Sequence, residues 1–179
     1  MVNFQIKEAK PEELDRFFKF FEKSLRTQFP QYSENTINFL VEKEFSKVWL
    51  KSELKTRQSI LLIAETNNGQ MVWFLVALRP YGGVSYCSWI AVAKEFQGRG
   101  VATALLRKWE KLAQKDGAHK VHLWTDCRNL KFYKRQGYKL AGKITLNYFG
   151  AKDYLFYKEI QKPREENYLR EFLKKAKKK

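Results

Sequence analysis

The chain has 179 residues, of which 44% are hydrophobic and 16% aromatic, and its 35 Lys and Arg against 19 Asp and Glu give a formal net charge of +16. This composition excludes an intrinsically disordered chain and suits a single domain that buries about two-thirds of its unfolded surface. No run approaches the roughly 18 apolar residues of a membrane span, and the first ten residues lack an apolar signal core, so we expect a cytoplasmic protein without transmembrane association.

The excess of basic residues favours polyanionic partners through long-range attraction. Cys87 and Cys127 are the only cysteines, and they form no Cys-x-x-Cys pair. Together with His119 and His122 they supply too few ligands for a structural zinc site. We therefore expect reduced thiols and no bound metal.

The N-terminal part is predicted to form one short strand and two helices. Residues 4–6 have a strand pattern, and Pro11 marks the start of a helix with Glu12 and Glu13 in its first turn. The apolar face of this helix consists of Leu14, Phe17, Phe18, Phe21 and Leu25. A second helix, capped by Ser33 or Asn35, is predicted to bury Ile37, Leu40, Val41, Phe45 and Val48.

The rest of the chain is predicted to form a mixed sheet. Strands are expected at residues 60–65, 71–79, 84–92, 121–125, 138–141 and 154–158. Asn68-Gly69 is a strong hairpin signal, so the first three of these strands should be antiparallel. A helix predicted at 101–116 acts as a crossover and makes the next strand parallel to its predecessor. The expected fold class is α/β, with a mixed, mostly antiparallel central sheet flanked by helices.

A short glycine loop, Gln97-Gly98-Arg99-Gly100-Val101-Ala102, lies where the strand at 84–92 gives way to this crossover helix. The first turn of a helix has unpaired amides and partial positive charge, so the loop is suited to bind phosphate. It is not a Walker loop, because no Lys-Ser/Thr pair follows. A Rossmann fingerprint would need its third glycine at the position of Thr103, and the antiparallel strands before the loop also count against a Rossmann domain. Only Asp126, which lies near the expected ribose-binding position, favours that interpretation.

The remaining pattern, Gln-x-x-Gly-x-Ala, resembles the GNAT superfamily of acyl-CoA N-acyltransferases. A second segment, from Asn129 to Tyr138, is similar to the Phe-Tyr-x-x-x-Gly-Phe/Tyr signature of that family through Phe132, Tyr133 and Gly137. The resemblance covers about residues 4–160 and is sharp only over 88–138. It implies a GNAT-like domain over residues 1–160, followed by a basic amphipathic C-terminal helix or tail over 161–179.

The resemblance also implies a co-substrate, acetyl-CoA, and the residues that would bind it. The pyrophosphate-binding residues would be Gln97, Gly98, Arg99, Gly100, Val101, Ala102 and Thr103. The backbone of Ile90, Ala91 and Val92, on a strand that splays from its neighbour, would bond the pantetheine and the thioester oxygen. Tyr133 matches the tyrosine that serves many members as general acid.

Two parts of the predicted site stay open. Many family members place an asparagine seven residues before the catalytic tyrosine, but that position is Asp126 here, and we expect Asn129 to make the pantetheine contact instead. Both residues could equally be helix caps. The general base is Glu65, His122, Asp126 or water, and a covalent relay through Cys127 is the least favoured scheme.

The predicted activity is direct transfer of an acetyl group to a primary amine of a small molecule or of a protein N-terminus or lysine. By resemblance Phe29 and Tyr32 border the acceptor site, although aromatics at such spacing are more often packing residues. The rival prediction is a nucleic-acid- or ribosome-binding protein on a GNAT-like scaffold, in which the lysine-rich tail contacts RNA. A third alternative, an enzyme that modifies RNA, would combine RNA binding with catalysis.

Overall fold

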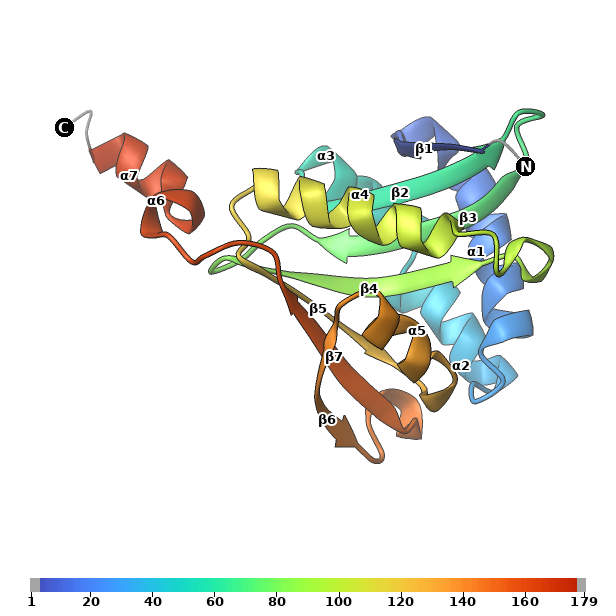
Figure 1. Cartoon of the computed structure of the whole chain (residues 1–179). Coiled ribbons are helices and arrows are strands. Elements are labelled where there is room, and N and C mark those ends of the chain that lie inside the picture. Colours follow the sequence, from blue (N-terminus) through green and yellow to red (C-terminus); the bar gives the residue numbers. More distant parts are fainter. Residues whose placement is uncertain (1–3, 177–179) are drawn as a thin grey trace. The chain divides into compact units, whose positions relative to one another are not determined.

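The computed structural model describes residues 4–176 (Figure 1). Within these residues one sheet has the strand order β1-β2-β3-β4-β5-β7-β6. Its strands are β1 (Phe4–Glu8), β2 (Ser59–Thr66), β3 (Met71–Leu78), β4 (Val84–Val92), β5 (Lys120–Thr125), β6 (Lys139–Ile144) and β7 (Asp153–Glu159). The helices are α1 (Leu14–Gln28), α2 (Glu34–Phe39), α3 (Lys47–Lys55), α4 (Val101–Lys115), α5 (Leu130–Arg135), α6 (Glu165–Tyr168) and α7 (Arg170–Ala176).

The predicted fold class is confirmed. β1 pairs antiparallel with β2, and β7 pairs antiparallel with both β5 and β6. β5 is parallel to β4 because α4 returns the chain to the same end of the sheet before β5 begins. The chain forms two compact units, one comprising residues up to Ala77 together with Trp89–Leu105, the other Leu78–Ser88 together with the residues from Leu106 onward.

The core of the first unit is built on the apolar face of α1. Four of the five residues predicted for this face are fully buried, and the fifth, Phe18, is half-buried. Phe17 and Phe21 lie edge-on to Phe74 of β3, with ring centroids 5.2 and 5.5 Å apart, and Phe21 also contacts Trp89 of β4. The 3.6-residue periodicity therefore predicted this interface correctly.

The second predicted helix is wrong as a single element. The Ser33 hydroxyl caps α2 by accepting a hydrogen bond from the Thr36 amide at 3.2 Å, but a π-helical turn (Leu40–Glu44) follows, and Ser46 caps the separate helix α3. Ser46 has an extended backbone, which interrupts the helical phase, so Val48 does not continue the apolar face. Val48 is 81% exposed, and Leu50 is buried in its place.

The second unit is organised around a buried polar contact. The indole nitrogen of Trp109 donates to the Ser85 hydroxyl at 3.0 Å, and that hydroxyl donates to the Leu78 carbonyl at 2.6 Å. Both side chains are fully buried, so the contact joins α4 to β4 without an unpaired polar group. Val121, Leu123 and Phe156 complete this core from β5 and β7.

The C-terminal segment forms α6 and α7, which are separate helices because Leu169 departs from helical geometry. Within the second unit the segment before α6 is held to the residues that follow α4, since the Gln161 side-chain amide donates to the Ala118 carbonyl at 2.7 Å. Phe172 is 67% exposed. The last three lysines of the predicted tail lie outside the described residues. No helix within residues 4–176 has the length and apolar character needed to cross a bilayer.

Gly117 and Gly137 provide a matched test of how tightly this segment is packed. Each ends a helix with positive φ, +98° and +82°, and each donates its amide to a carbonyl three residues earlier at 3.0 Å. A Cβ on Gly117 would lie 2.4 Å from the Asn167 carbonyl oxygen, whereas a Cβ on Gly137 would make only ordinary contact, 3.7 Å from Lys158.

We predict that Gly137→Ala lowers the free energy of unfolding by about 1–2 kcal/mol, the cost of a left-handed alanine. Gly117→Ala should cost about 1–3 kcal/mol more, because the backbone of Asn167 must also shift. Urea unfolding of both variants measures the difference. Equal losses would show that the segment after Gln161 does not pack against Gly117.

Candidate active site

The glycine loop belongs to the first unit, between β4 and α4. After β4 the Ala93 amide donates to the Val72 carbonyl at 3.0 Å, and a single turn, Lys94–Phe96, leads into Gln97. Gly98 and Gly100 have φ of +76° and +78°, a conformation that favours glycine. No heavy atom lies within 4 Å of a Cβ built on either residue, so the space beside the loop is open to a ligand.

The electrostatic character of this loop is positive. The Ala104 amide reaches the Gly100 carbonyl at 3.1 Å, so the amides of Val101, Ala102 and Thr103 form the first turn of α4 and have no helical acceptor. The Arg99 guanidinium lies 5.4 Å from the centre of the Phe96 ring, and the Lys94 side chain is exposed. Helix N-terminus, guanidinium and ammonium together suit a polyanion.

The strand that precedes the loop was predicted to bind the pantetheine through its backbone. Ala91 is buried, and Ile90 and Val92 are half-buried. The parallel pairing with β5 in the second unit runs from Val84–Lys120 to Cys87–Leu123, and β4 continues to Val92. The splayed geometry and the backbone contacts of Ile90, Ala91 and Val92 stay predictions.

Tyr133 lies on α5 in the second unit and is 3% exposed. Its ring packs 5.7 Å from the rings of both Tyr138 and Phe156, and its phenol shares a hydrogen bond with the Thr125 hydroxyl at the end of β5. Burial raises the pKa of Tyr133 above its ordinary value, and the nearby Cys87 and Asp126 raise it further. The phenol is therefore held in its neutral form, able to donate a hydrogen bond.

Asp126 and Asn129, just after β5, differ in how many of their polar side-chain atoms already form hydrogen bonds or ion pairs. Asp126 caps the following turn and is paired with Arg128. The Asn129 side-chain nitrogen donates to the Thr125 hydroxyl at 3.2 Å, and the Asn129 side-chain oxygen accepts no hydrogen bond within residues 4–176. Of the two, Asn129 retains the free polar atom that the predicted pantetheine contact requires.

The candidate bases are placed very differently. Glu65 is in an ion-pair network with Lys7 at 2.8 Å and with Arg16, in the first unit, where it joins β1, β2 and α1. His122 stacks on Tyr86 at 5.0 Å, and burial followed by the charge of Lys120 lowers its pKa. Cys127 is exposed and Cys87 is buried, and neither forms a disulfide within the part of the chain that the structure describes. Within the described residues no group of three or more His, Cys, Asp or Glu could hold a metal ion.

Sequence reasoning missed Asp153, the first residue of β7. It is half-buried, and its carboxylate accepts a hydrogen bond from the Asn147 amide at 2.9 Å. Burial, and then the repulsion of Asp126, raise the pKa of the Asp153 carboxyl. The only signal in the sequence was its position directly before the strand predicted at 154–158.

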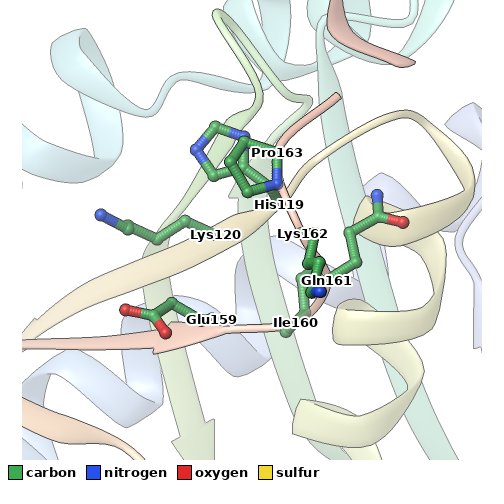
Figure 2. Close-up of a pocket in the computed structure, with 7 residues that line it drawn as sticks. All are labelled: His119, Lys120, Glu159, Ile160, Gln161, Lys162 and Pro163. Atoms are coloured by element: carbon green, nitrogen blue, oxygen red, sulfur yellow. The ribbon is translucent and has the colours of Figure 1, made fainter. Parts of the chain in front are cut away.

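A cavity of about 560 Å³ lies at the opposite end of β5 from Thr125 (Figure 2). It is lined by His119, Lys120, Glu159, Ile160, Gln161, Lys162 and Pro163. Figure 2 shows the Lys120 ammonium and the Glu159 carboxylate extending to the same side. None of the sequence-predicted site residues lines this cavity.

Comparison with known proteins decides the family. The sequence model of the acetyltransferase (GNAT) family matches residues 16–138. The chain belongs to that family. An uncharacterized N-acetyltransferase of Methanocaldococcus jannaschii is 26% identical in an alignment 154 residues long that covers 76% of this chain. The chain spans only 61% of the length of that relative.

Solved structures of GNAT acetyltransferases have a similar fold. The PaiA N-acetyltransferase of Thermoplasma acidophilum, solved with coenzyme A, gives a TM-score of 0.72 at 18% identity and covers 88% of this chain and 99% of its own. The Salmonella typhimurium protein yncA, solved with acetyl-CoA, gives a TM-score of 0.71 at 14% identity and covers 90% of this chain and 96% of its own. Ard1 of Thermoplasma volcanium gives a TM-score of 0.66 at 19% identity and covers 90% of this chain and 100% of its own.

The protonation state of Tyr133 can be measured by titrating tyrosine ionisation at 295 nm. Because folding raises the pKa of the phenol, Tyr133 should stay neutral up to pH 11 while the protein remains folded, and Tyr133→Phe should leave the amplitude between pH 9 and 11 unchanged. The pKa of Tyr133 is higher in the folded protein than in the unfolded chain. Its contribution to the free energy of unfolding is therefore lost as the pH rises past about 10. Loss of one phenol's amplitude in the variant would contradict the buried placement.

Proposed function

We propose that the protein is an N-acetyltransferase that moves an acetyl group from acetyl-CoA directly to a primary amine. The observation that carries the proposal is the open loop around Gly98 and Gly100 at the N-terminus of α4. An added side chain at either position would occupy the space that a pyrophosphate needs, and the amides beside it have no other acceptor in the helix. The residues present therefore fit the co-substrate.

In this proposal the loop residues 97–103 bind the pyrophosphate. Arg99 adds a charge-assisted contact, and the Asn129 side-chain oxygen accepts a hydrogen bond from a pantetheine amide. Acetyl-CoA supplies the activated thioester. The backbone amides of Ile90, Ala91 and Val92 orient and polarise its carbonyl oxygen.

Tyr133 would then act on the departing sulfur mainly as a hydrogen-bond donor. A free phenol is already a weaker acid than a free thiol by about 1.5 pKa units, or ~2 kcal/mol. Burial of Tyr133 increases this difference, so complete proton transfer to the thiolate is more unfavourable than in water. A neutral phenol held by Thr125 can stabilise the developing negative charge without giving up its proton.

The acceptor is a primary amine of a small molecule or of a protein N-terminus or lysine. The net charge of +16 disfavours small polycations as acceptors through long-range repulsion. Phe29 and Tyr32 stack on each other at 5.9 Å and pack against the hydrophobic core of the first unit, which supports a packing role for both. No observation in residues 4–176 favours the RNA- or ribosome-binding alternative.

The loop assignment predicts the effect of adding a negative charge at Gly100. Calorimetric titration of acetyl-CoA should show that Gly100→Glu raises Kd at least about 10-fold, because a carboxylate a few ångströms from the pyrophosphate repels it. Gly69→Glu is the matched control: Gly69 lies in the same unit, has φ of +77° and is equally open. Equal weakening by both variants, or by neither, would refute the assignment.

The role of Tyr133 predicts a selective loss of turnover. Tyr133→Phe should lower kcat about 100-fold while acetyl-CoA binding is unchanged, since only the leaving-group interaction is removed. Tyr138→Phe is the control, because Tyr138 is equally buried and donates a hydrogen bond to Glu110 at 2.9 Å. Full kcat in Tyr133→Phe would contradict the assigned role.

A further inference from the structure

The carboxylate of Asp153 is half-buried and unneutralised in a strongly basic protein. Within residues 4–176 no lysine or arginine forms an ion pair with it. Lys152 precedes it in the chain, and its pairing partner on β6 is the apolar Ile144, whereas Lys143 pairs with Tyr154. Its one hydrogen bond comes from the Asn147 amide and occupies a single oxygen, Oδ2. The other oxygen, Oδ1, makes no hydrogen bond within the described residues.

The other charge that acts on Asp153 is that of Asp126. This second carboxylate repels Asp153, but its own charge is offset by Arg128. Asp153 therefore retains a net attraction for a cation that can reach it. Half-burial without a cationic partner is costly for a carboxylate, and such an arrangement is typical of a group that meets its partner only in a complex.

Strand pairing places Asp153 at the same end of the second unit as Tyr133. Tyr154 pairs with Thr125 in the β5–β7 register, and Thr125 holds the Tyr133 phenol. Asp153 thus lies just beyond the carboxyl end of β5. Because neighbouring residues of a strand alternate between faces, Asp153 belongs to the face opposite to that of Thr125.

This separation suits acyl transfer. A nucleophile approaches the carbonyl carbon from one side, and a leaving group departs from another. A hydrogen-bond donor for the leaving sulfur and an acceptor for the amine proton are therefore expected on different faces. Tyr133, which contacts Thr125 from α5, and Asp153, on the opposite face of β7, meet that requirement at one end of the β5–β7 pair.

We propose that Asp153 binds the protonated amine of the acceptor and accepts its proton. The inference rests on the proposed N-acetyltransferase function. An N–H bond of the ammonium breaks and an O–H bond forms at Asp153 Oδ1, which leaves the nitrogen lone pair free to attack the thioester carbonyl. The C–N bond then replaces the C–S bond, coenzyme A leaves as the thiolate, and the nitrogen loses a second proton to water as the amide forms. The proton then passes from Asp153 to water, and the Asn147 amide keeps the carboxylate in place throughout.

The test compares two amines of different basicity, n-butylamine, with a pKa near 10.4, and glycinamide, with a pKa near 8. At pH 7 the first is almost wholly protonated and depends on a base, whereas about a tenth of the second is already neutral. Asp153→Asn should lower kcat/KM for n-butylamine at least about 30-fold, and that for glycinamide only a few-fold. The loss with n-butylamine should shrink as the pH is raised to 9.5.

Glu159→Gln is the control variant, because it removes the same charge from the other end of β7 and should leave both rates unchanged. Asp153→Glu should recover part of the n-butylamine rate. Equal, pH-independent losses with both amines, or no loss with either, would overturn the inference.

Thermal unfolding separates a chemical role from a structural one. The side-chain amide introduced by Asp153→Asn can still accept the hydrogen bond from Asn147, and the substitution removes the repulsion from Asp126. Since the folded-state pKa of Asp153 is raised, its ionisation destabilises the fold above the unfolded pKa near 4, so the Tm of Asp153→Asn at pH 7 should equal or exceed that of the parent. A Tm lowered by several degrees would assign Asp153 a structural role instead.

Failure of this inference is distinguishable from failure of the proposed function. If the parent protein binds acetyl-CoA but transfers acetyl groups to neither amine, Asp153 has no amine to act on and the inference fails, while the loop assignment stands. If the parent does not bind acetyl-CoA, the proposed function fails and the inference falls with it.

Discussion

Helix α4 depends on the buried hydrogen bond between the Trp109 indole and Ser85. An indole nitrogen without a partner would be costly in a closed core, and the Ser85 hydroxyl accepts its proton while donating to the Leu78 carbonyl. The contact fixes the rotation of α4 against β4 in the second unit. The same helix begins at Val101, directly after Gly100, so its first turn supplies the unpaired amides of the loop.

The proposed chemistry rests on an asymmetry between two titratable groups in the second unit. Burial favours the neutral form of the Tyr133 phenol, which suits a donor to a developing thiolate. Asp153 is only half-buried and forms no ion pair within residues 4–176, which suits an acceptor for an ammonium proton. At a site of acid–base chemistry one expects a pair of titratable groups of which one is kept as a proton donor and the other as a proton acceptor by their surroundings.

The sequence predicted the elements around the loop well because local signals set their limits. Turns that contain glycine or asparagine separate β2, β3 and β4, and α4 begins after Gly100 and ends before Gly117. The ends of these elements therefore lie within one or two residues of the predicted ends. The helix after Ser33 was predicted as one element because its apolar spacing continues to Val48. Ser46, which could have been recognised as a cap, instead starts a new helix and turns Val48 to solvent.

The environment of each candidate side chain could not be predicted in the same way. The raised pKa of Tyr133 depends on Tyr138 and Phe156, and Phe156 meets it only through the pairing of β7 with β5. Asp153 is 20 residues away from Tyr133 along the chain, and only that pairing brings it to the end of β5. Such long-range placement has no local signature in the sequence.

The central claim is that backbone amides of the loop bind the pyrophosphate of coenzyme A, and amide NMR tests it most directly. Titration with coenzyme A should shift the Gly98, Gly100 and Ala102 amide resonances downfield in a saturable manner, because they gain a charged acceptor. Pantetheine, which lacks the pyrophosphate, should leave the same three resonances in place. Equal shifts with both ligands, or none with coenzyme A, would contradict the account.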